Sequence, residues 1–474
     1  MRIQWLKIFF VLLVSIVFVS GCSKTVKEKT KTSPTAKALE RSEKSGVDNS
    51  TQNIKGLGLS EKEVIDTYVY ILGRYLVIRQ EHIDLAEEGL DYNTIKYNEL
   101  GKAEFVNPNL DVAYLEAWFA VDEETPVILE IPKIEGRYYT AQIVDEWAEI
   151  LYNINERNYP DHPYGAYALC LKGSDPVIPE GALRIDLPSK KAKMLARVER
   201  KGDDKGALQL QRAFRITKMG DYQIEKAVDI PIFTNKDLIR VEVFQKPMVE
   251  KVLASAPDSM NLAGEYKERV LAISDFIGKS EANKSKIDAI IKEKALRHLL
   301  SLVMGDVRGD SRYGWATTRE WVAFGDDFEF RTSVNYAGIW WNSSLEVVYY
   351  MGIKDKDGQP LHGDNRYLIH YKPEDLPMKQ VDAYWSLTML SLPDYRVVPN
   401  KLEQYNLNNI SKLHYEADGS LKIYLASELP PATPESNWLP SPKGRHFTIN
   451  NRFYVPKKEV LSGEWYVPPV QKIK

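Results

Sequence analysis

The chain has 474 residues, of which 44% are hydrophobic and 27% are charged, and its formal net charge is -3. This composition is typical of globular domains and excludes a fully disordered chain or a polytopic membrane protein. Because no broad basic field is available to hold phosphates, we expect no nucleic-acid partner.

The N-terminus carries the pattern of an export signal. Arg2 and Lys7 precede an uncharged apolar run, Ile8 to Val19, which is shorter than the roughly 20 residues that cross a bilayer. Small residues and Cys22 follow this run. The pattern resembles a bacterial lipoprotein signal and predicts a signal peptide over residues 1–21. The resemblance implies that Cys22 is acylated, which makes membrane lipid a partner.

The expected location follows from this signal. We predict an extracytoplasmic protein that is anchored to a membrane through Cys22. By the same resemblance, Ser23 after the cysteine implies the periplasmic side of the outer membrane if the cell has two membranes. The alternatives, an uncleaved anchor or an ordinary secretory signal, also place the body outside the cytoplasm. Lipidation of Cys22 leaves Cys170 alone, so we expect no intramolecular disulfide.

Ordered structure is expected to begin only after a polar segment. Residues 22–58 predict a disordered tether because Lys, Thr, Ser and Glu dominate and large apolar residues are scarce. A capping box at residues 60–63 then predicts a helix, in which apolar residues recur at three- and four-residue steps to about Glu88. We interpret Arg74 and Arg79 as part of the solvated polar face of this helix.

The first domain, residues 59–235, continues with a period of two. Short runs rich in Val, Ile, Tyr and Leu are separated by turns that contain Gly and Asp. Strands at this spacing, without helices between them, predict an antiparallel β-sandwich. The predicted strands are Asp111–Val121, Val127–Ile131, Arg137–Asp145, Tyr164–Leu171, Leu183–Leu187, Ala192–Val198 and Leu208–Ile216.

The rest of the chain predicts a helical element followed by a second β domain. Helical periodicity returns over residues 236–308, where we expect two or three helices that pack against the sandwiches. Residues 309–474 predict a C-terminal jelly-roll-like β-sandwich domain with a hairpin turn at Asp418-Gly419, so the fold class is multi-domain and mainly β with a helical part. The predicted strands of this domain are Glu346–Gly352, Tyr367–Tyr371, Ala383–Leu390, Lys412–Glu416, Leu421–Ala426 and Phe447–Tyr454.

Short motifs in both halves of the chain resemble those of a known protein family. The motifs are Asn109-Leu110-Asp111, Gly136-Arg137-Tyr138-Tyr139, Ala383 to Met389, Asn437 to Pro440 and Arg452 to Tyr454. They resemble a paired bacterial family in which one domain of unknown function, DUF1254, is followed by another, DUF1214. The resemblance implies two β-sandwiches and a helical element, and it implies no activity. This chain has Tyr384 where the family pattern usually has Phe.

Known catalytic spacings are absent from the sequence. It contains none of the zinc-protease, nucleophile-elbow, phosphate-loop or dinucleotide-binding motifs. The seven His residues are scattered, with no pair at metal-ligand spacing on one face. We therefore expect no cofactor and no metal centre, with convergence of dispersed ligands in the folded chain left open as the alternative.

A polar cluster in the first sandwich is the strongest candidate site. Asp111, Arg137 and Asp145 are candidate catalytic residues, because two carboxylates beside an Arg can transfer protons or bind a polar ligand. A structural network that joins strands and loops is the alternative. The same motifs contain three candidate ligand-binding residues: Asn109, Tyr139 and Gln142.

A second candidate site lies in the C-terminal half. Trp385, Trp438 and Arg452, with Arg331 and Lys443 as further cations, could line a groove for a sugar or an anionic ligand. Packing of the Trp residues in the core is the alternative.

These observations lead to two functional hypotheses. The first is a lipid-anchored cell-envelope protein of unknown biochemical activity, an accessory lipoprotein that binds a small ligand or an envelope partner and is not an enzyme. The alternative is an envelope hydrolase that uses the carboxylate and Arg cluster of the N-terminal sandwich. A buried Asp with a shifted pKa beside Arg137 in an open pocket would favour the hydrolase.

Overall fold

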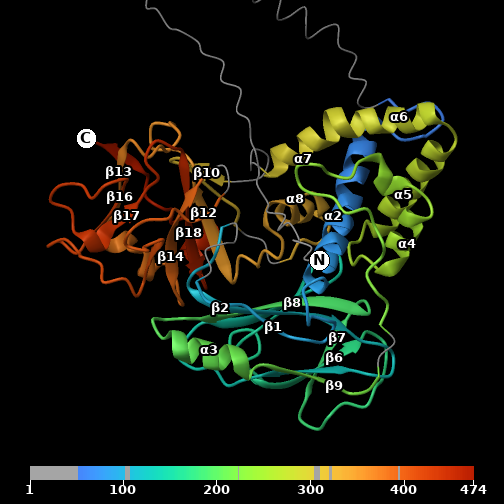
Figure 1. Cartoon of the computed structure of the whole chain (residues 1–474), viewed down its shortest axis with the longest axis horizontal. Helices are drawn as coiled ribbons and strands as arrows, with labels where there is room; N and C mark the ends of the chain where they lie inside the picture. Colours follow the sequence, from blue (N-terminus) through green and yellow to red (C-terminus); the bar gives the residue numbers. More distant parts are fainter. Residues whose placement is uncertain (1–51, 102–106, 222–223, 304–309, 320–322, 393–394) are drawn as a thin grey trace, which may run out of the picture.

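A computed structural model describes residues 52–474 except 102–106, 222–223, 304–309, 320–322 and 393–394. The predicted signal peptide, Cys22 and most of the predicted tether lie outside the described residues. The predicted end of the tether at residue 58 is wrong, because Ile54 is 5% exposed in the core of the helical body and its N donates to Leu59 O at 2.7 Å. The described chain is multi-domain and mainly β with a helical part, which confirms the predicted fold class. It forms a helical body, an N-terminal sandwich and a C-terminal sandwich, which lie at upper right, bottom and left in Figure 1.

The helical body is organised around α2 (Glu61–Leu85), which begins at the predicted capping box of residues 60–63. Buried residues lie on nearly all sides of this helix, as expected for a helix that other elements surround. Arg74 and Arg79 are 0% and 2% exposed, so our interpretation of a solvated face is wrong. The Arg74 charge is compensated in the interior, because its Nη2 pairs with Glu146 Oε1 at 3.0 Å.

Helices from two later segments of the chain pack around α2. They are α4 (Met248–Ser255), α5 (Ala263–Gly278), α6 (Glu281–Ile290), α7 (Leu296–Val303) and α8 (Phe328–Gly338). The α8 helix crosses α2 beside Gly73, where Thr332 Oγ1 donates a hydrogen bond to Val69 O at 3.1 Å. The sequence predicts only β structure after residue 308 and groups α2 with the first sandwich, whereas α2 and α8 both belong to the helical body (Figure 1).

The N-terminal sandwich consists of two sheets, with strand orders β1-β2-β8-β4-β5 and β7-β6-β3-β9. Apolar side chains of both sheets, such as Phe119, Leu129 and Ile143, share one buried core. Among the described strands of this sandwich, only β6 and β7 pair in parallel. The strands are β1 (Lys96–Tyr97), β2 (Val112–Ala120), β3 (Val127–Ile131), β4 (Tyr139–Val144), β5 (Ile150–Ile154), β6 (Gly165–Leu171), β7 (Leu183–Leu187), β8 (Lys191–Glu199) and β9 (Arg215–Lys218).

One predicted strand of this domain, Leu208–Ile216, is wrong over most of its length. Residues Asp204–Ala213 form α3 instead, and only the last part of the segment enters β9. The Asp203 side chain accepts a hydrogen bond from Gly206 N and caps the helix. Alternating Leu and Gln residues imitate a strand here, but the cap stabilises a helix.

The C-terminal sandwich also consists of two sheets, with strand orders β10-β11-β12-β18-β14-β15 and β17-β16-β13-β19. Val348, Ile369 and Leu387 are among the side chains from both sheets that share its core. The strands are β10 (Asp310–Arg312), β11 (Trp315–Thr317), β12 (Val347–Gly352), β13 (Arg366–Tyr371), β14 (Trp385–Ser391), β15 (Asn406–Asn408), β16 (Leu421–Ala426), β17 (Trp438–Pro440), β18 (Phe447–Tyr454) and β19 (Gln471–Ile473).

The predicted hairpin of this domain is only partly correct. The turn is present, because Gly419 has a φ of +82° and its N donates to Glu416 O at 2.8 Å. The predicted strand Lys412–Glu416 is not formed, and this described segment makes one isolated bridge, between Tyr415 and Leu421.

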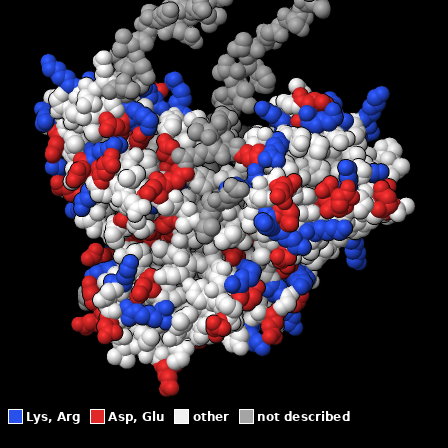
Figure 2. All heavy atoms as spheres, turned by 180° about the vertical axis from the view of Figure 1, so that it is seen from behind, with Lys and Arg blue, Asp and Glu red and all other residues white. Residues whose placement is uncertain are grey.

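The surface carries mixed charges. Acidic and basic side chains are interspersed over the face drawn in Figure 2, without a broad area of one sign. In the part of the chain that the structure describes, no helix has the length and apolarity needed to span a membrane.

Candidate functional site

A pocket of about 170 Å³ lies where the N-terminal sandwich meets the C-terminal sandwich. We name it the interdomain pocket. Its walls come from the residues before β2, the segment that joins β8 to α3, and the regions of β14 and β15. The residues that decide its chemistry are Asp111, Glu199, Arg200, Tyr384, Asn406 and Asn408.

Asp111 contributes a buried carboxylate to this pocket and is 7% exposed. Its Oδ1 accepts hydrogen bonds from Asn406 Nδ2 and Asn408 Nδ2, each at 2.7 Å. These two Asn residues lie on the same face of β15 because side chains alternate along a strand. Asp111 Oδ2 is buried and has no hydrogen-bond partner among the described residues. Since buried polar atoms are usually paired, this oxygen is an unused hydrogen-bond acceptor on a residue that lines the pocket.

The backbone around Asp111 is held by both domains. Asp111 N donates to Asn109 Oδ1 at 2.8 Å, and Arg200 N donates to Asp111 O at 2.7 Å. The Asn109 amide in turn donates to the Tyr384 hydroxyl at 3.2 Å and to the Tyr454 hydroxyl. Asn109 therefore positions Asp111 and joins the two domains at the edge of the pocket.

Glu199 is the second acid of the pocket and is 4% exposed. Its Oε2 accepts a hydrogen bond from Tyr138 N at 2.9 Å. Burial raises the pKa of Glu199 and the Asp111 carboxylate raises it further, while the Tyr138 bond and the charges of Lys201 and Arg137 act in the opposite direction. The pocket therefore contains two buried acids, and the pKa of Glu199 lies above its usual value.

The neighbouring Arg side chains are engaged with the protein. Arg200 Nε and Nη2 donate to the two carboxylate oxygens of Asp204, both at 2.7 Å. Arg137 Nη1 donates to Glu199 O at 3.1 Å and its Nη2 donates to Asp203 Oδ2 at 3.0 Å. The pocket is thus better suited to a ligand that donates hydrogen bonds to Asp111 than to an anion.

The predicted cluster of three catalytic candidates is split by the fold. Asp111 and Arg137 both lie beside Glu199 and Arg200. Asp145 follows the opposite end of β4, a six-residue strand that spans about 20 Å. Alternation along this strand cannot bring its two ends together, so Asp145 belongs to a different environment.

That environment is a buried acidic cluster between the N-terminal sandwich and the helical body. Asp145 Oδ1 accepts hydrogen bonds from Trp147 N and Glu149 N, both at 2.8 Å, and its Oδ2 has no partner among the described residues. Arg331 of α8 pairs with both oxygens of Asp258 at 3.0 and 2.7 Å, and its Nη1 lies 3.9 Å from Glu149 Oε2. Burial raises the pKa of Asp145 to about 7, although Arg331 lowers it.

The other candidates of the first sandwich have structural contacts. Gln142 Oε1 accepts a hydrogen bond from Arg197 Nη1 at 2.8 Å, and its Nε2 donates to Trp341 O at 2.7 Å. The Tyr139 ring lies in the sandwich core, and its hydroxyl donates to Pro163 O at 2.6 Å. Neither residue lines the interdomain pocket.

The aromatic groove predicted in the C-terminal half is not formed by the described residues. Trp385 is 2% exposed in the core, and Trp438 Nε1 donates to Ala426 O at 2.8 Å. Arg452 is buried and donates to Thr388 Oγ1 and to Asn107 Oδ1, both at 2.7 Å. Trp385 and Arg452 face opposite sides of one sheet, because Trp385 pairs with Phe453 and side chains alternate along β18, while Trp438 lies on β17 of the other sheet.

The sequence candidates do not include Glu199, Arg200 or Asn408 of the interdomain pocket. Glu199 and Arg200 belong to a charged run at the end of a predicted strand. Asn406 and Asn408 are two positions apart, so in a strand their side chains lie on the same face. These patterns indicate polar side chains at strand ends, but neither pattern indicates that the two segments meet.

Each half of the chain matches a known family model. Residues 92–218 match the family model described as a protein of unknown function, DUF1254, and residues 346–458 match the one described as a protein of unknown function, DUF1214. No curated protein matches the chain.

Matches to two solved structures cover most of the chain. The VPA0106 protein from Vibrio parahaemolyticus is 19% identical with a TM-score of 0.64, and the match covers 87% of this chain and 100% of that one. An uncharacterized protein from Burkholderia cenocepacia is 12% identical with a TM-score of 0.40, and the match covers 93% and 95% of the two chains. At this identity, the Vibrio structure supports the fold alone.

Proposed function

Because the chain belongs to the family that pairs a DUF1254 domain with a DUF1214 domain, we propose that it binds a small polar ligand between these domains as a lipid-anchored cell-envelope protein. The observation that carries the proposal is the Asp111 carboxylate, whose Oδ2 is buried at the interdomain pocket without a partner among the described residues. A ligand hydroxyl or amino group would provide the missing donor.

The class of ligand follows from the size and chemistry of the pocket. Its volume of about 170 Å³ is below the roughly 300–1,000 Å³ of sites for drug-sized molecules. The acceptor at Asp111 and the amides of Asn406 and Asn408 suit a neutral or cationic compound with several hydroxyl or amino groups. We therefore propose a monosaccharide-sized polyol or amine rather than a polymer or a phosphate.

Ligand binding is tested by calorimetric titration with a panel of sugars, polyols, amines and sugar phosphates. One class of polyol or amine should bind the wild type, and Asp111→Asn should weaken its binding at least about tenfold, because the acceptor for a ligand donor is lost. Asp275→Asn, at an exposed position on α5, is the matched control and should bind normally. Preferred binding of the phosphates, or equal binding by Asp111→Asn, would contradict the proposal.

The proposed location rests on the N-terminal pattern that ends at Cys22. The mature protein would begin at a diacylglyceryl-modified Cys22, with the polar segment from Ser23 to about residue 51 as a tether that holds the domains at the membrane surface. Intact mass and membrane fractionation of the wild type and of Cys22→Ala test this arrangement. The wild type should carry the lipid and sediment with membranes, and the variant should do neither. An unmodified wild type that begins at Met1 would exclude the anchor.

One observation favours an enzyme as the second candidate function. Glu199 has a raised pKa and lies near Asp111 in the same pocket, and a pair of neighbouring carboxyl groups can serve as a general acid and a general base. This hydrolase would use Asp111 and Glu199, with Arg137 holding the Glu199 backbone. Turnover of glycoside or ester substrates by the wild type, and its loss in both Glu199→Gln and Asp111→Asn, would support the hydrolase. Ligand binding without turnover would favour the binding protein instead.

A further inference from the structure

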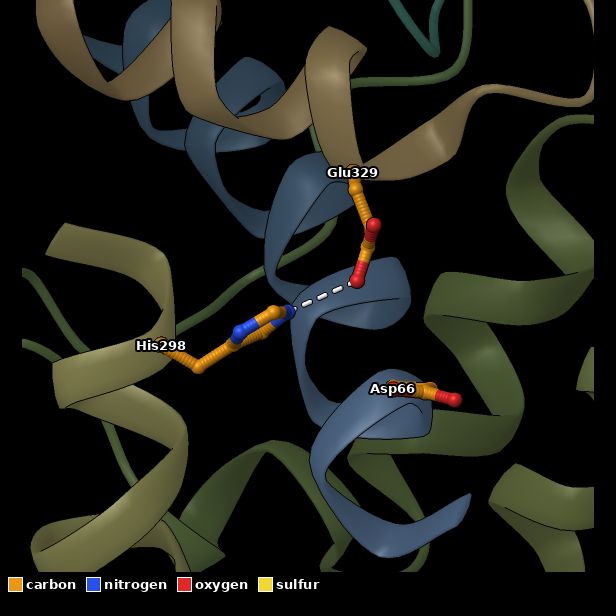
Figure 3. A group of neighbouring side chains, drawn as sticks. All are labelled: Asp66, His298 and Glu329. Atoms are coloured by element: carbon orange, nitrogen blue, oxygen red, sulfur yellow. Dashed lines mark hydrogen bonds and ion pairs between the residues drawn. The ribbon is translucent and has the colours of Figure 1, made fainter. Parts of the chain in front are cut away.

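We infer that Asp66, His298 and Glu329 form a binding site for one divalent transition-metal ion, for which Zn²⁺ is the best-matched ion. The three side chains come from α2, α7 and α8 and converge in the helical body, outside the interdomain pocket (Figure 3). One ligand atom from each residue lies within 4.8 Å of the other two. His298 Nε2 and Glu329 Oε1 are already 2.7 Å apart.

The donor set fits a borderline metal ion. Zn²⁺ accepts imidazole nitrogen and carboxylate oxygen at about 2.0–2.2 Å, and an open site uses three protein ligands with water at the fourth position. Donors around such an ion lie roughly 3.4 Å apart. A contraction of at most about 1.4 Å, from the 4.8 Å limit to about 3.4 Å, would therefore bring the most distant pair into range. Rotation of the partly exposed Glu329 and His298 side chains can supply this movement.

The local charge balance around Asp66 can accept a bound cation. Asp66 is 8% exposed, and its Oδ2 pairs with Lys62 Nζ at 2.5 Å. The Lys62 side chain is 70% exposed, so it can move into solvent when an ion approaches. Arg269, which lies beside the first turn of α2, is engaged with Glu265 and Glu63. Two carboxylates beside an imidazole are a favourable environment for a dication.

A bound ion would connect helices that are far apart in the sequence. Asp66 lies in the second turn of α2, while Glu329 lies in the first turn of α8. His298 lies on α7, which also packs against α8. Metal binding stabilises a folded state that contains the site over an unfolded chain that lacks it. The ion would therefore fasten α2, α7 and α8 together.

The first test is a titration of the full-length chain, stripped with EDTA, with ZnCl₂ and CoCl₂. We expect one Zn²⁺ per chain, a rise in Tm of about 3 °C at roughly 100 times the Kd, and the visible absorption of Co²⁺ in a low-symmetry site. His298→Ala, Asp66→Asn and Glu329→Gln should each weaken binding at least about tenfold, after circular dichroism has verified that they fold. Absence of stoichiometric binding by the wild type would overturn the inference.

Two further variants separate metal binding from a purely structural role of the His298–Glu329 pair. Lys62→Ala removes a competing cation from the surface and should tighten Zn²⁺ binding severalfold, which a purely structural pair would not produce. His362→Ala is the matched control, because His362 Nδ1 also lies beside a carboxylate, 3.5 Å from Asp364 Oδ2. Its affinity should equal that of the wild type. Loss of binding in His362→Ala, or an unchanged affinity in both Lys62→Ala and His298→Ala, would refute the site.

Discussion

At the scale of single residues, buried acids dominate the chemistry of this protein. Asp145, Glu149 and Asp258 surround one cation, Arg331, so the cluster has more carboxyl groups than positive charges. Removing a carboxylate from water is unfavourable unless hydrogen bonds and opposite charges compensate it. Asp258 obtains both through Arg331, whereas one oxygen of Asp145 has no partner among the described residues.

This environment predicts how stability depends on pH. The pKa of Asp145 is raised from 3.8 to about 7 in the folded chain. Its contribution to stability is therefore full below about pH 4 and is lost as the pH rises through about 7. Asp145→Asn remains neutral throughout, so its free energy of unfolding relative to the wild type should increase by about 2 kcal/mol between about pH 5 and pH 8.

Urea unfolding of both proteins at the two pH values measures this difference. The exposed Asp275 has a lowered pKa and stays ionised over the same interval, so Asp275→Asn should show a constant difference from the wild type. A constant difference for Asp145→Asn as well would mean that Asp145 is ionised at both pH values.

At the scale of elements, the central position of α2 depends on a close helix crossing. A Cβ atom at Gly73 would lie 2.5 Å from Thr332 Oγ1 of α8, which is closer than side chains approach in folded proteins. Glycine at this position is therefore required by space and not by backbone conformation. The same crossing carries the hydrogen bond from Thr332 to Val69 O, so both helices contribute to its geometry.

We predict that Gly73→Ala destabilises the protein by about 1–3 kcal/mol, because α8 must move to avoid overpacking. Thr332→Ala removes the opposing atom and should recover part of the loss in the double variant. Gly264→Ala on α5 is the matched control, since a Cβ there meets no atom within 4 Å, and a gain of up to about 1 kcal/mol is expected from helix propensity. Thermal unfolding of these variants and the wild type would measure the effects. Equal Tm values for Gly73→Ala and Gly264→Ala would disprove the requirement for glycine where α2 and α8 cross.

At the scale of the whole molecule, polar and aromatic contacts join the two sandwiches. The Tyr384 and Tyr454 rings stack with centroids 4.2 Å apart, and the Tyr138 ring packs edge-on against both. Tyr138 also donates its hydroxyl to Glu346 Oε2 at 2.8 Å, and Arg157 Nη2 donates to the same oxygen at 2.7 Å. This contact fixes the relative position of the walls of the interdomain pocket.

Loss of Glu346 should weaken this junction. Glu346→Ala removes the acceptor that the Tyr138 hydroxyl and Arg157 Nη2 share, although Arg157 Nη1 keeps its bond to Glu156. Leaving the buried Tyr138 hydroxyl unsatisfied costs about 1–3 kcal/mol. Calorimetry should then resolve separate unfolding of the two sandwiches, whereas the wild type should unfold in one transition. Glu346→Gln keeps the shape of the side chain and should lose less stability. A single unshifted transition in Glu346→Ala would show that other contacts hold the domains together.

Local sequence patterns predict much of the fold. The capping box, the alternation of β3, β7 and β18, and the family motifs predict elements and a fold class that the structure and the comparisons confirm. The predictions are wrong where neighbouring segments override the local pattern. The Asp203 cap converts an alternating run into α3, and surrounding helices bury the polar residues of α2.

Most of the order of β and helical segments, with α3 and α8 as the exceptions, can be derived from the amino-acid sequence, because caps and periodicity depend on residues only a few positions apart. The sequence also indicates the export signal, which stays a prediction. Which polar residues meet is decided instead by tertiary packing. Asp111 reaches Asn406, and Asp66 reaches His298 and Glu329, through packing between elements that lie hundreds of residues apart in the chain. No local pattern encodes such contacts, since they depend on how whole layers dock.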